Sequence, residues 1–204
     1  MRAPSFAGVI LAAGESSRMG RDKALLTWQG KSFVQAQLEL LREHSELVIV
    51  VAGKNLPALE PAVYSSGGFL ISNPQPELGQ FSSLKTGLRE ILNRGRDAAL
   101  IALVDRPPCQ TETVALLKQR FRQVYAEGKW AVVPEFQGKH GHPILAGREM
   151  IEAFLTAPAT SNAREVEHAL AARIDYFPVE DPSVAMNIDT PEDYERLQLQ
   201  ISQK

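Results

Sequence analysis

The chain has 204 residues, a formal net charge of −2 and 44% hydrophobic residues. That composition indicates a globular protein large enough to bury a sizeable core, and its near-neutral charge favours neither a nucleic-acid nor a membrane partner. No apolar run reaches the roughly 20 residues of a membrane span, and the N-terminus lacks the pattern of a signal peptide. The single cysteine, Cys109, excludes an intrachain disulfide, which favours a cytoplasmic protein, and we expect it to be a small buried residue.

Apolar runs alternate with helical patterns along the chain. Residues 6–13 predict a buried strand, and residues 14–20 predict a glycine-bounded turn behind it. A helix is expected at 33–43, opened by a capping box at Ser32 and Gln35. The expected elements that follow are, in order, strands at 47–52 and 68–72, a helix at 82–92 that starts at a serine, a strand at 98–104 and a helix at 112–126.

The last third continues the alternation. It predicts a strand at 130–134, a short extended segment at 142–145, helices at 148–155 and 162–172, extended segments at 174–179 and 185–188, and a final helix from Thr190. There is no internal repeat, low-complexity tract or linker. The sequence therefore predicts one α/β domain over residues 1–204, built on a doubly wound, mostly parallel, Rossmann-like sheet.

Such sheets bind ligands at the carboxyl ends of their strands. Three suggestive features fall there: the loop at 14–23 after the first strand, Asp105 after the central strand, and Asp189 after the expected strand at 185–188. Small residues let backbone N–H groups approach phosphate oxygens, and loop cations neutralise their charge. The loop is neither a Walker A motif nor the G-x-G-x-x-G fingerprint, and a β–α turn with incidental charges is the simpler alternative.

The combination of motifs is more specific than the turn alone. The segment LAAGESSRMGRDKALL at 11–26 resembles the signature of MobA-like nucleotidyltransferases, most closely the molybdenum cofactor cytidylyltransferase group. The resemblance continues, in the same order, through ELGQFSSLKTGL at 77–88, ALVDRPPC at 102–109, GHPILAG at 141–147 and NIDTPEDYERL at 187–197. It implies a fold of the nucleotide-diphospho-sugar transferase type. It also implies transfer of a nucleoside monophosphate from CTP, or from GTP, to a phosphorylated acceptor such as molybdopterin, with Mg²⁺ and release of pyrophosphate.

The resemblance and the residue chemistry together assign roles. Arg18 and Lys23 are expected to bind the triphosphate, and Asp105 and Asp189 to hold Mg²⁺, with Arg18, Lys23 and Asp105 forming the catalytic set. His142 is a candidate for contact with the acceptor. The expected nucleotide-binding residues are Leu11, Ala12, Ala13, Gly14, Gly20, Gly79, Ser82 and Ser83.

Each role has a structural alternative. Asp105 could cap the turn before Pro107, Asp189 could satisfy backbone donors ahead of a helix cap, and Arg18 could be a surface charge. His142 could brace its glycine-rich loop. Ser82 and Ser83 could do no more than cap a helix.

The nucleotide and the acceptor stay open at this stage. The family resemblance associates Ala13 with cytidine-using members, where guanosine-using members have glycine. Arg106 departs from the family, which often has Met or Gln after the aspartate, and so does Asn162-Ala163-Arg164, where Gly-Ala-Arg is common. Both departures lie where the acceptor is expected, so a sugar or polyol phosphate is an alternative acceptor. A non-catalytic nucleotide sensor is the alternative from another class, and an NAD-dependent oxidoreductase is opposed by the loop spacing.

Overall fold

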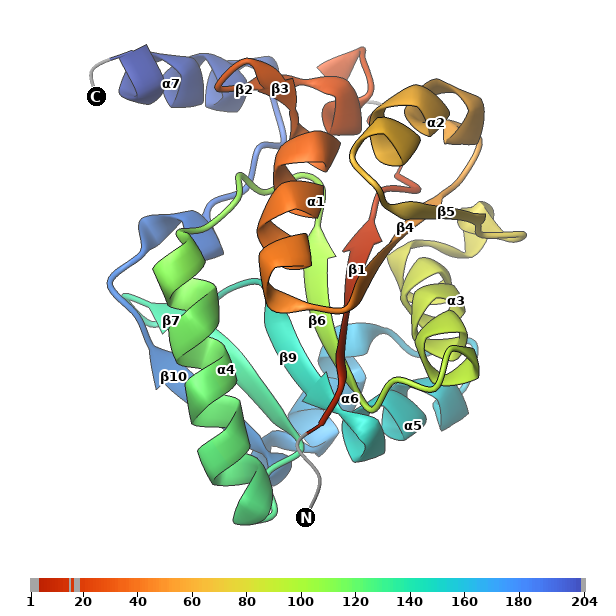
Figure 1. The fold of residues 1–204 in the computed structure, drawn as a ribbon, viewed down its shortest axis with the longest axis vertical. Helices are drawn as coiled ribbons and strands as arrows, with labels where there is room; N and C mark the ends of the chain where they lie inside the picture. Colours follow the sequence, from red (N-terminus) through yellow and green to blue (C-terminus); the bar gives the residue numbers. More distant parts are fainter. Residues whose placement is uncertain (1–3, 15, 17–18, 203–204) are drawn as a thin grey trace.

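The structure is a computed structural model that describes residues 4–202 apart from residues 15, 17 and 18 (Figure 1). The expected triphosphate ligand Arg18 lies outside the described residues. One eight-stranded sheet runs through the described chain in the order β10-β7-β9-β6-β1-β4-β5, with β8 beside β7. Its strands are β1 Phe6–Leu11, β4 Leu47–Ala52, β5 Phe69–Ser72, β6 Ala98–Leu103, β7 Ala131–Phe136, β8 Lys139–His140, β9 Ile144–Gly147 and β10 Ile174–Pro178.

The sheet is mostly parallel, as predicted. β1 pairs in parallel with β4 and β6, β4 with β5, and β10 with β7, whereas β9 runs antiparallel between β6 and β7. The carboxyl ends of β1 and β6 therefore meet at one edge, at the top of Figure 1. A two-stranded hairpin, β2 Thr27–Trp28 and β3 Lys31–Ser32, lies above that edge.

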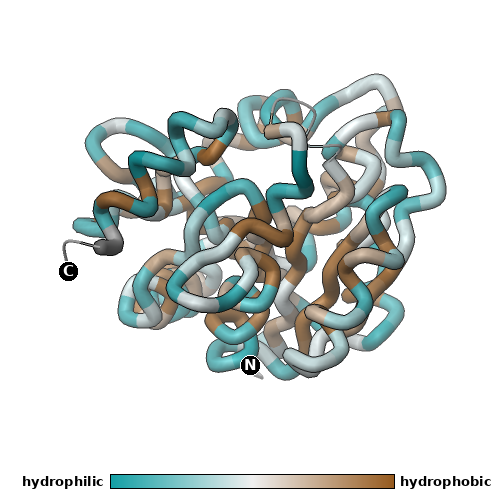
Figure 2. The backbone as a smooth tube through the Cα atoms, turned by 90° about the horizontal axis from the view of Figure 1, so that it is seen from above, coloured by the Kyte–Doolittle hydropathy of each residue, from teal (hydrophilic) through white to brown (hydrophobic). Residues whose placement is uncertain are grey.

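Helices cover both faces of the sheet, which confirms the doubly wound α/β class. The helices are α1 Phe33–His44, α2 Leu56–Ser65, α3 Gln80–Asn93, α4 Thr111–Ala126, α5 Arg148–Thr156, α6 Ala163–Ala169 and α7 Pro191–Ser202. Helices α1 and α4 lie on the near face of Figure 1, and α3 and α5 on the far face. Seen from above, the apolar stretches lie toward the interior and hydrophilic segments toward the outside (Figure 2).

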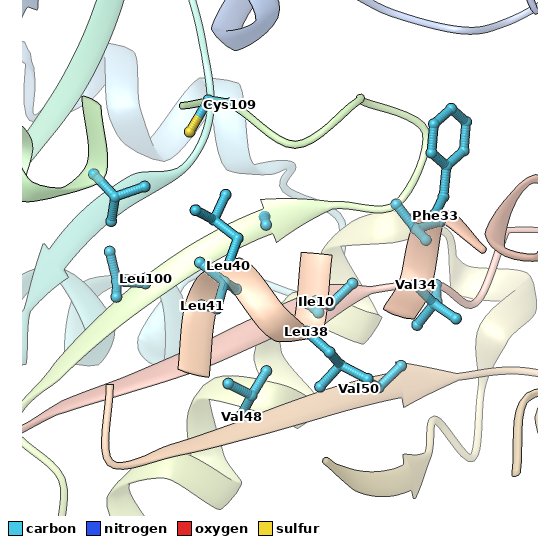
Figure 3. Close-up of a cluster of buried hydrophobic side chains, with 14 of the residues drawn as sticks. Ile10, Phe33, Val34, Leu38, Leu40, Leu41, Val48, Val50, Leu100 and Cys109 are labelled. Atoms are coloured by element: carbon cyan, nitrogen blue, oxygen red, sulfur yellow. The ribbon is translucent and has the colours of Figure 1, made fainter. Parts of the chain in front are cut away.

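The alternation of side chains along the central strand explains the two cores. Ile10 of β1 packs on the face that α1 covers, and Val9 and Leu11 pack on the face that α3 covers. Figure 3 shows the first of these cores, with Ile10 and Val50 from the strands beside Leu38 of α1. Every residue of β1 is buried, as expected for a strand with helices on both sides.

Several boundaries differ from the predictions. β1 ends at Leu11, before the predicted end at residue 13, and α2 was not predicted because two prolines obscure its pattern. Helix α3 begins at Gln80, with Gly79 as its N-cap, so the prediction that a serine caps it was wrong. The segment expected to be extended at 185–188 was wrong in part, because Pro182–Ala185 forms a short 3-10 helix. Within the described residues, no helix is both long and apolar enough to cross a bilayer.

Candidate active site

Three of the predicted site residues converge at the carboxyl edge of the sheet. Lys23 Nζ lies 2.7 Å from Asp189 Oδ1 and 3.9 Å from Asp105 Oδ2. The Lys23 side chain is only 12% exposed, and the two aspartates are about one-third exposed, at 30% and 32%. One ammonium group thus lies between two carboxylates that are 84 residues apart in the sequence (189 − 105).

The backbone around Lys23 is fixed by short-range and long-range hydrogen bonds. Lys23 begins a 3-10 turn, Lys23–Leu25, whose cap Asp22 accepts a hydrogen bond from the Ala24 N–H at 2.9 Å. Asn55 Nδ2 donates to Asp22 Oδ2 at 2.7 Å and to the Ala12 carbonyl at 2.8 Å. Asn55 therefore ties the end of the first strand to the residue before Lys23, which the sequence reasoning did not foresee.

Asp189 reaches the cluster from the C-terminal part of the chain. The Ile188 N–H donates to the Asp105 carbonyl at 2.9 Å, which attaches this segment to the end of β6. Asp193 Oδ2 accepts from the N–H groups of Asp189 and Thr190 at 3.1 and 3.0 Å, so the first turn of α7 holds the backbone in place. The expectation that Asp189 follows a strand was wrong, and this hydrogen-bonded connection places it at the sheet edge instead.

Asp105 has one carboxylate oxygen that makes no hydrogen bond in the described residues. Burial raises the pKa of this carboxyl, and the neighbouring cations Lys23 and Arg106 oppose the effect. Asp105 Oδ1 is buried and has no hydrogen-bond partner among the described residues. A buried acceptor without a partner costs about 1–3 kcal/mol, so this oxygen is suited to a cation supplied from outside the chain.

A cavity of about 560 Å³ opens beside the cluster, and we call it the phosphate cavity. Lys23 and Asp105 line it, together with Ser16 and with the predicted nucleotide-binding residues Leu11, Ala13, Gly14, Gly79 and Ser83. Three other predicted residues, Ala12, Gly20 and Ser82, do not line it in the described part of the chain. Ala12 is instead buried, at 1% exposure, with its N–H bonded to the Val51 carbonyl.

Asn73 lies behind one wall of this cavity and is bonded to Ser83, which lines it. It is 3% exposed, and its Nδ2 donates to the hydroxyls of Ser82 and Ser83 at 2.7 and 2.9 Å. Its Oδ1 accepts from the Gln75 N–H at 3.0 Å. The two serines therefore join α3 to the loop after β5 and do not cap the helix. In the sequence, Asn73 had only the signal of a turn residue.

A second cavity, of about 720 Å³, adjoins the first and shares Leu11, Gly79 and Gln80 with it. We call it the acceptor cavity. Arg106 and the predicted acceptor residue His142 line it. Burial, and secondarily the Arg106 charge, lowers the pKa of His142 to about 3, so its imidazole is neutral at pH 7.

Cys109 takes no part in either cavity. It is 8% exposed, and burial followed by the nearby Asp181 charge raises the pKa of its thiol to about 12. The prediction of a small buried residue is confirmed, because such a thiol carries almost no thiolate at neutral pH.

One family model covers most of the chain. The model of the MobA-like NTP transferase domain matches residues 8–174. The chain belongs to the MobA-like NTP transferase family. The predicted family is thereby confirmed. The matched region contains Lys23, the end of β6 and every residue that lines the phosphate cavity, while Tyr176 of the second cavity and Asp189 lie beyond it.

Relatives of this chain are named as transferases of two different nucleotides. The chain is 26% identical over 189 residues to a molybdenum cofactor cytidylyltransferase of Escherichia coli K12, covering 91% of this chain and 92% of that one. It is 28% identical over 197 residues to a molybdenum cofactor guanylyltransferase of Xanthomonas euvesicatoria, covering 94% of each. A solved protein of Mycobacterium tuberculosis H37Rv has the same fold, with a TM-score of 0.79, 24% identity and coverage of 97% of this chain and 98% of that one.

Proposed function

We propose that this MobA-like protein transfers a nucleoside monophosphate, CMP from CTP in preference to GMP from GTP, to the phosphate of molybdopterin and releases pyrophosphate. The observation that supports this most is the meeting of Lys23, Asp105 and Asp189 beside the phosphate cavity. The two most informative relatives are both named as nucleotidyltransferases of the molybdenum cofactor.

The proposed reaction requires cations and alignment more than a base. An oxygen of the acceptor phosphate attacks the α-phosphorus of the nucleotide, a new P–O–P linkage forms, and the bond from the α-phosphorus to the β-phosphate oxygen breaks. A phosphate dianion as nucleophile and pyrophosphate as leaving group keep the charge balanced with no proton to transfer. The neutral His142 is therefore not required as a general base, and the barrier is lowered by Lys23 and by holding the two phosphates in line.

The residues at the cluster fit a magnesium ion. The described residues contain no group of three or more His, Cys, Asp or Glu side chains that could hold a metal. Mg²⁺ is nevertheless commonly held by one or two carboxylates together with water and substrate phosphates. Asp105 and Asp189 supply two hard oxygen donors, and Asp105 Oδ1 is the buried acceptor without a partner. Bound there, the ion would neutralise charge on the phosphates.

Lys23 would have two successive partners in this scheme. Without nucleotide, its ammonium neutralises Asp189 at 2.7 Å. A triphosphate in the phosphate cavity offers it oxygens of greater negative charge, and the carboxylates then become available to the metal ion. This exchange accounts for a lysine that is 12% exposed and yet lines a ligand cavity.

The preference for CTP is the finer part of the proposal. Ala13 lines the phosphate cavity, and its methyl group leaves less room beside a base than glycine would. An Ala13→Gly variant should therefore shift the ratio of kcat/KM for CTP and GTP toward GTP. An unchanged ratio would remove Ala13 as the basis of selection.

The test is the release of pyrophosphate by purified protein with Mg²⁺, CTP or GTP, and molybdopterin, with sugar and polyol phosphates as comparison acceptors. Turnover with molybdopterin, faster with CTP, is expected. Asp105→Asn should lower kcat by about 100-fold or more, since electrostatic groups at such sites contribute that much. Asp97→Asn, at the other end of β6 and paired with Ser5 at 3.0 Å, is the matched control and should leave turnover unchanged. Activity only with sugar phosphates, or an active Asp105→Asn variant, would contradict the proposal.

A further inference from the structure

Two consecutive residues at the end of β6 face the two adjoining cavities. Asp105 lines the phosphate cavity, and Arg106 lines the acceptor cavity. The two cavities adjoin, because Leu11, Gly79 and Gln80 line both of them.

Buried polar atoms without a hydrogen-bond partner belong to residues that line these two cavities. The described residues contain four buried side-chain nitrogen or oxygen atoms with no hydrogen-bond partner. Three of them lie here: Asp105 Oδ1, Arg106 Nε and His142 Nδ1. Buried polar groups are nearly always paired in folded proteins, so this concentration indicates a polar ligand that the chain itself does not provide.

The Arg106 guanidinium is held in place through its Nη1 atom. Its Nη1 donates to the Val184 carbonyl at 2.8 Å, and its own carbonyl accepts from Gln37 Nε2 at 3.0 Å. The His142 N–H donates to the same Val184 carbonyl at 2.9 Å, which places His142 beside Arg106. Within the described part of the chain, Arg106 Nε and Nη2 make no hydrogen bond and the guanidinium forms no ion pair within 4.0 Å.

We propose that Arg106 binds the phosphate of the acceptor, with His142 beside it as a hydrogen-bonding partner. A guanidinium presents several donors in a plane and matches phosphate oxygens better than any other side chain. This proposal rests on the proposed function, because it assumes a phosphorylated acceptor in the acceptor cavity. It adds a specific residue that the family motif does not supply, since Arg106 stands where Met or Gln is common.

The position also answers an electrostatic need of the reaction. Two phosphates that approach each other repel, and the repulsion must be offset on both sides. Lys23, 3.9 Å from Asp105, stands on the nucleotide side, and Arg106 stands on the acceptor side. Arg106 thus aligns the nucleophile while Lys23 and the metal neutralise the nucleotide.

The experiment measures binding, so it does not depend on turnover. Protein saturated with Mg²⁺ and α,β-methylene CTP, which cannot react, is titrated with inorganic phosphate in a calorimeter. The Arg106→Met variant should bind phosphate about tenfold or more weakly than wild type, as expected when a charged hydrogen-bonding partner is lost. Its affinity for the nucleotide analogue should stay within about threefold of wild type, which shows that it folds, and Arg106→Lys should recover part of the phosphate affinity.

Arg96→Met is the matched control. Arg96 also has a buried, unpartnered Nε, but it precedes β6 at the opposite edge of the sheet and pairs with Glu46 at 3.1 Å. This variant should bind phosphate like wild type. The proposal is overturned if wild type binds no phosphate beside the nucleotide, if Arg106→Met binds it as tightly as wild type, or if both variants lose affinity equally. If phosphate binding behaves as expected but molybdopterin supports no turnover, the anion site stands and the proposed acceptor falls.

Discussion

Replacement of His142 by asparagine should make the protein less sensitive to acid. Burial lowers the pKa of His142 to about 3 in the folded state, whereas an unfolded histidine titrates near about 6.5. The stability that this group contributes is therefore fully present above the unfolded pKa and is lost as the pH falls toward the folded pKa. At pH 5, preferential protonation of the unfolded chain lowers the free energy of unfolding by about 2 kcal/mol. The asparagine variant does not lose this stability, because asparagine does not titrate.

The assay is urea denaturation at pH 7 and at pH 5, followed by the fluorescence of the two tryptophans. The fall in the free energy of unfolding between these pH values should be about 2 kcal/mol smaller in His142→Asn than in wild type. His168→Asn is the control, because His168 is exposed at the rim of the same cavity. The reasoning is refuted if His142→Asn and wild type lose the same stability on acidification. That result would mean that His142 is protonated in the folded protein and adds charge to the acceptor cavity.

Two further substitutions test the scaffold of the phosphate cavity. Asn73→Ala removes three hydrogen bonds of a buried side chain, to Gln75, Ser82 and Ser83. It should lower the free energy of unfolding by about 2–4 kcal/mol and raise the KM for nucleotide, and unchanged values of both would show that Asn73 does not hold this wall. Gly53→Ala would place a Cβ atom 2.9 Å from the backbone oxygen of Ala13, so it should displace the nucleotide loop and weaken binding of α,β-methylene CTP in calorimetry, and a wild-type affinity would count against that close approach.

The parts of the fold that the sequence predicts best are those that local chemistry determines. The run at Leu47–Ala52 is continuous and β-branched, and the strand has those bounds. The capping box at Ser32 begins α1 where the pattern indicates, and α6 begins directly after Asn162, at the start of the helix predicted for 162–172. Helix α2 was not predicted because Pro61 lies inside it, and proline destabilises a helix interior. The helix packs against β5 and α1, and the local sequence pattern does not reveal these stabilising contacts.

The candidate site was predictable in part, where residues carry a local chemical signal. Lys23 and Asp105 follow strands and carry an obvious chemical signal, and the structure brings them together. Asp189 was expected after a strand that the described residues do not form. The long-range hydrogen bonds from Ile188 to Asp105 and from Lys23 to Asp189 place it at the sheet edge instead. Asn55 has no such signal, because its role depends on contacts with residues more than 30 positions away in the sequence.

The central claim is that a metal ion helps the Lys23–Asp105–Asp189 cluster to bind a triphosphate. The most direct test uses Mn²⁺, a paramagnetic substitute for Mg²⁺. It is titrated into protein that contains α,β-methylene CTP, and its binding is followed by electron paramagnetic resonance. Asp105→Asn and Asp189→Asn should each weaken Mn²⁺ binding to the nucleotide complex by about tenfold or more, while Asp97→Asn should not change it. Equal Mn²⁺ affinity in wild type and in both cluster variants would contradict the account.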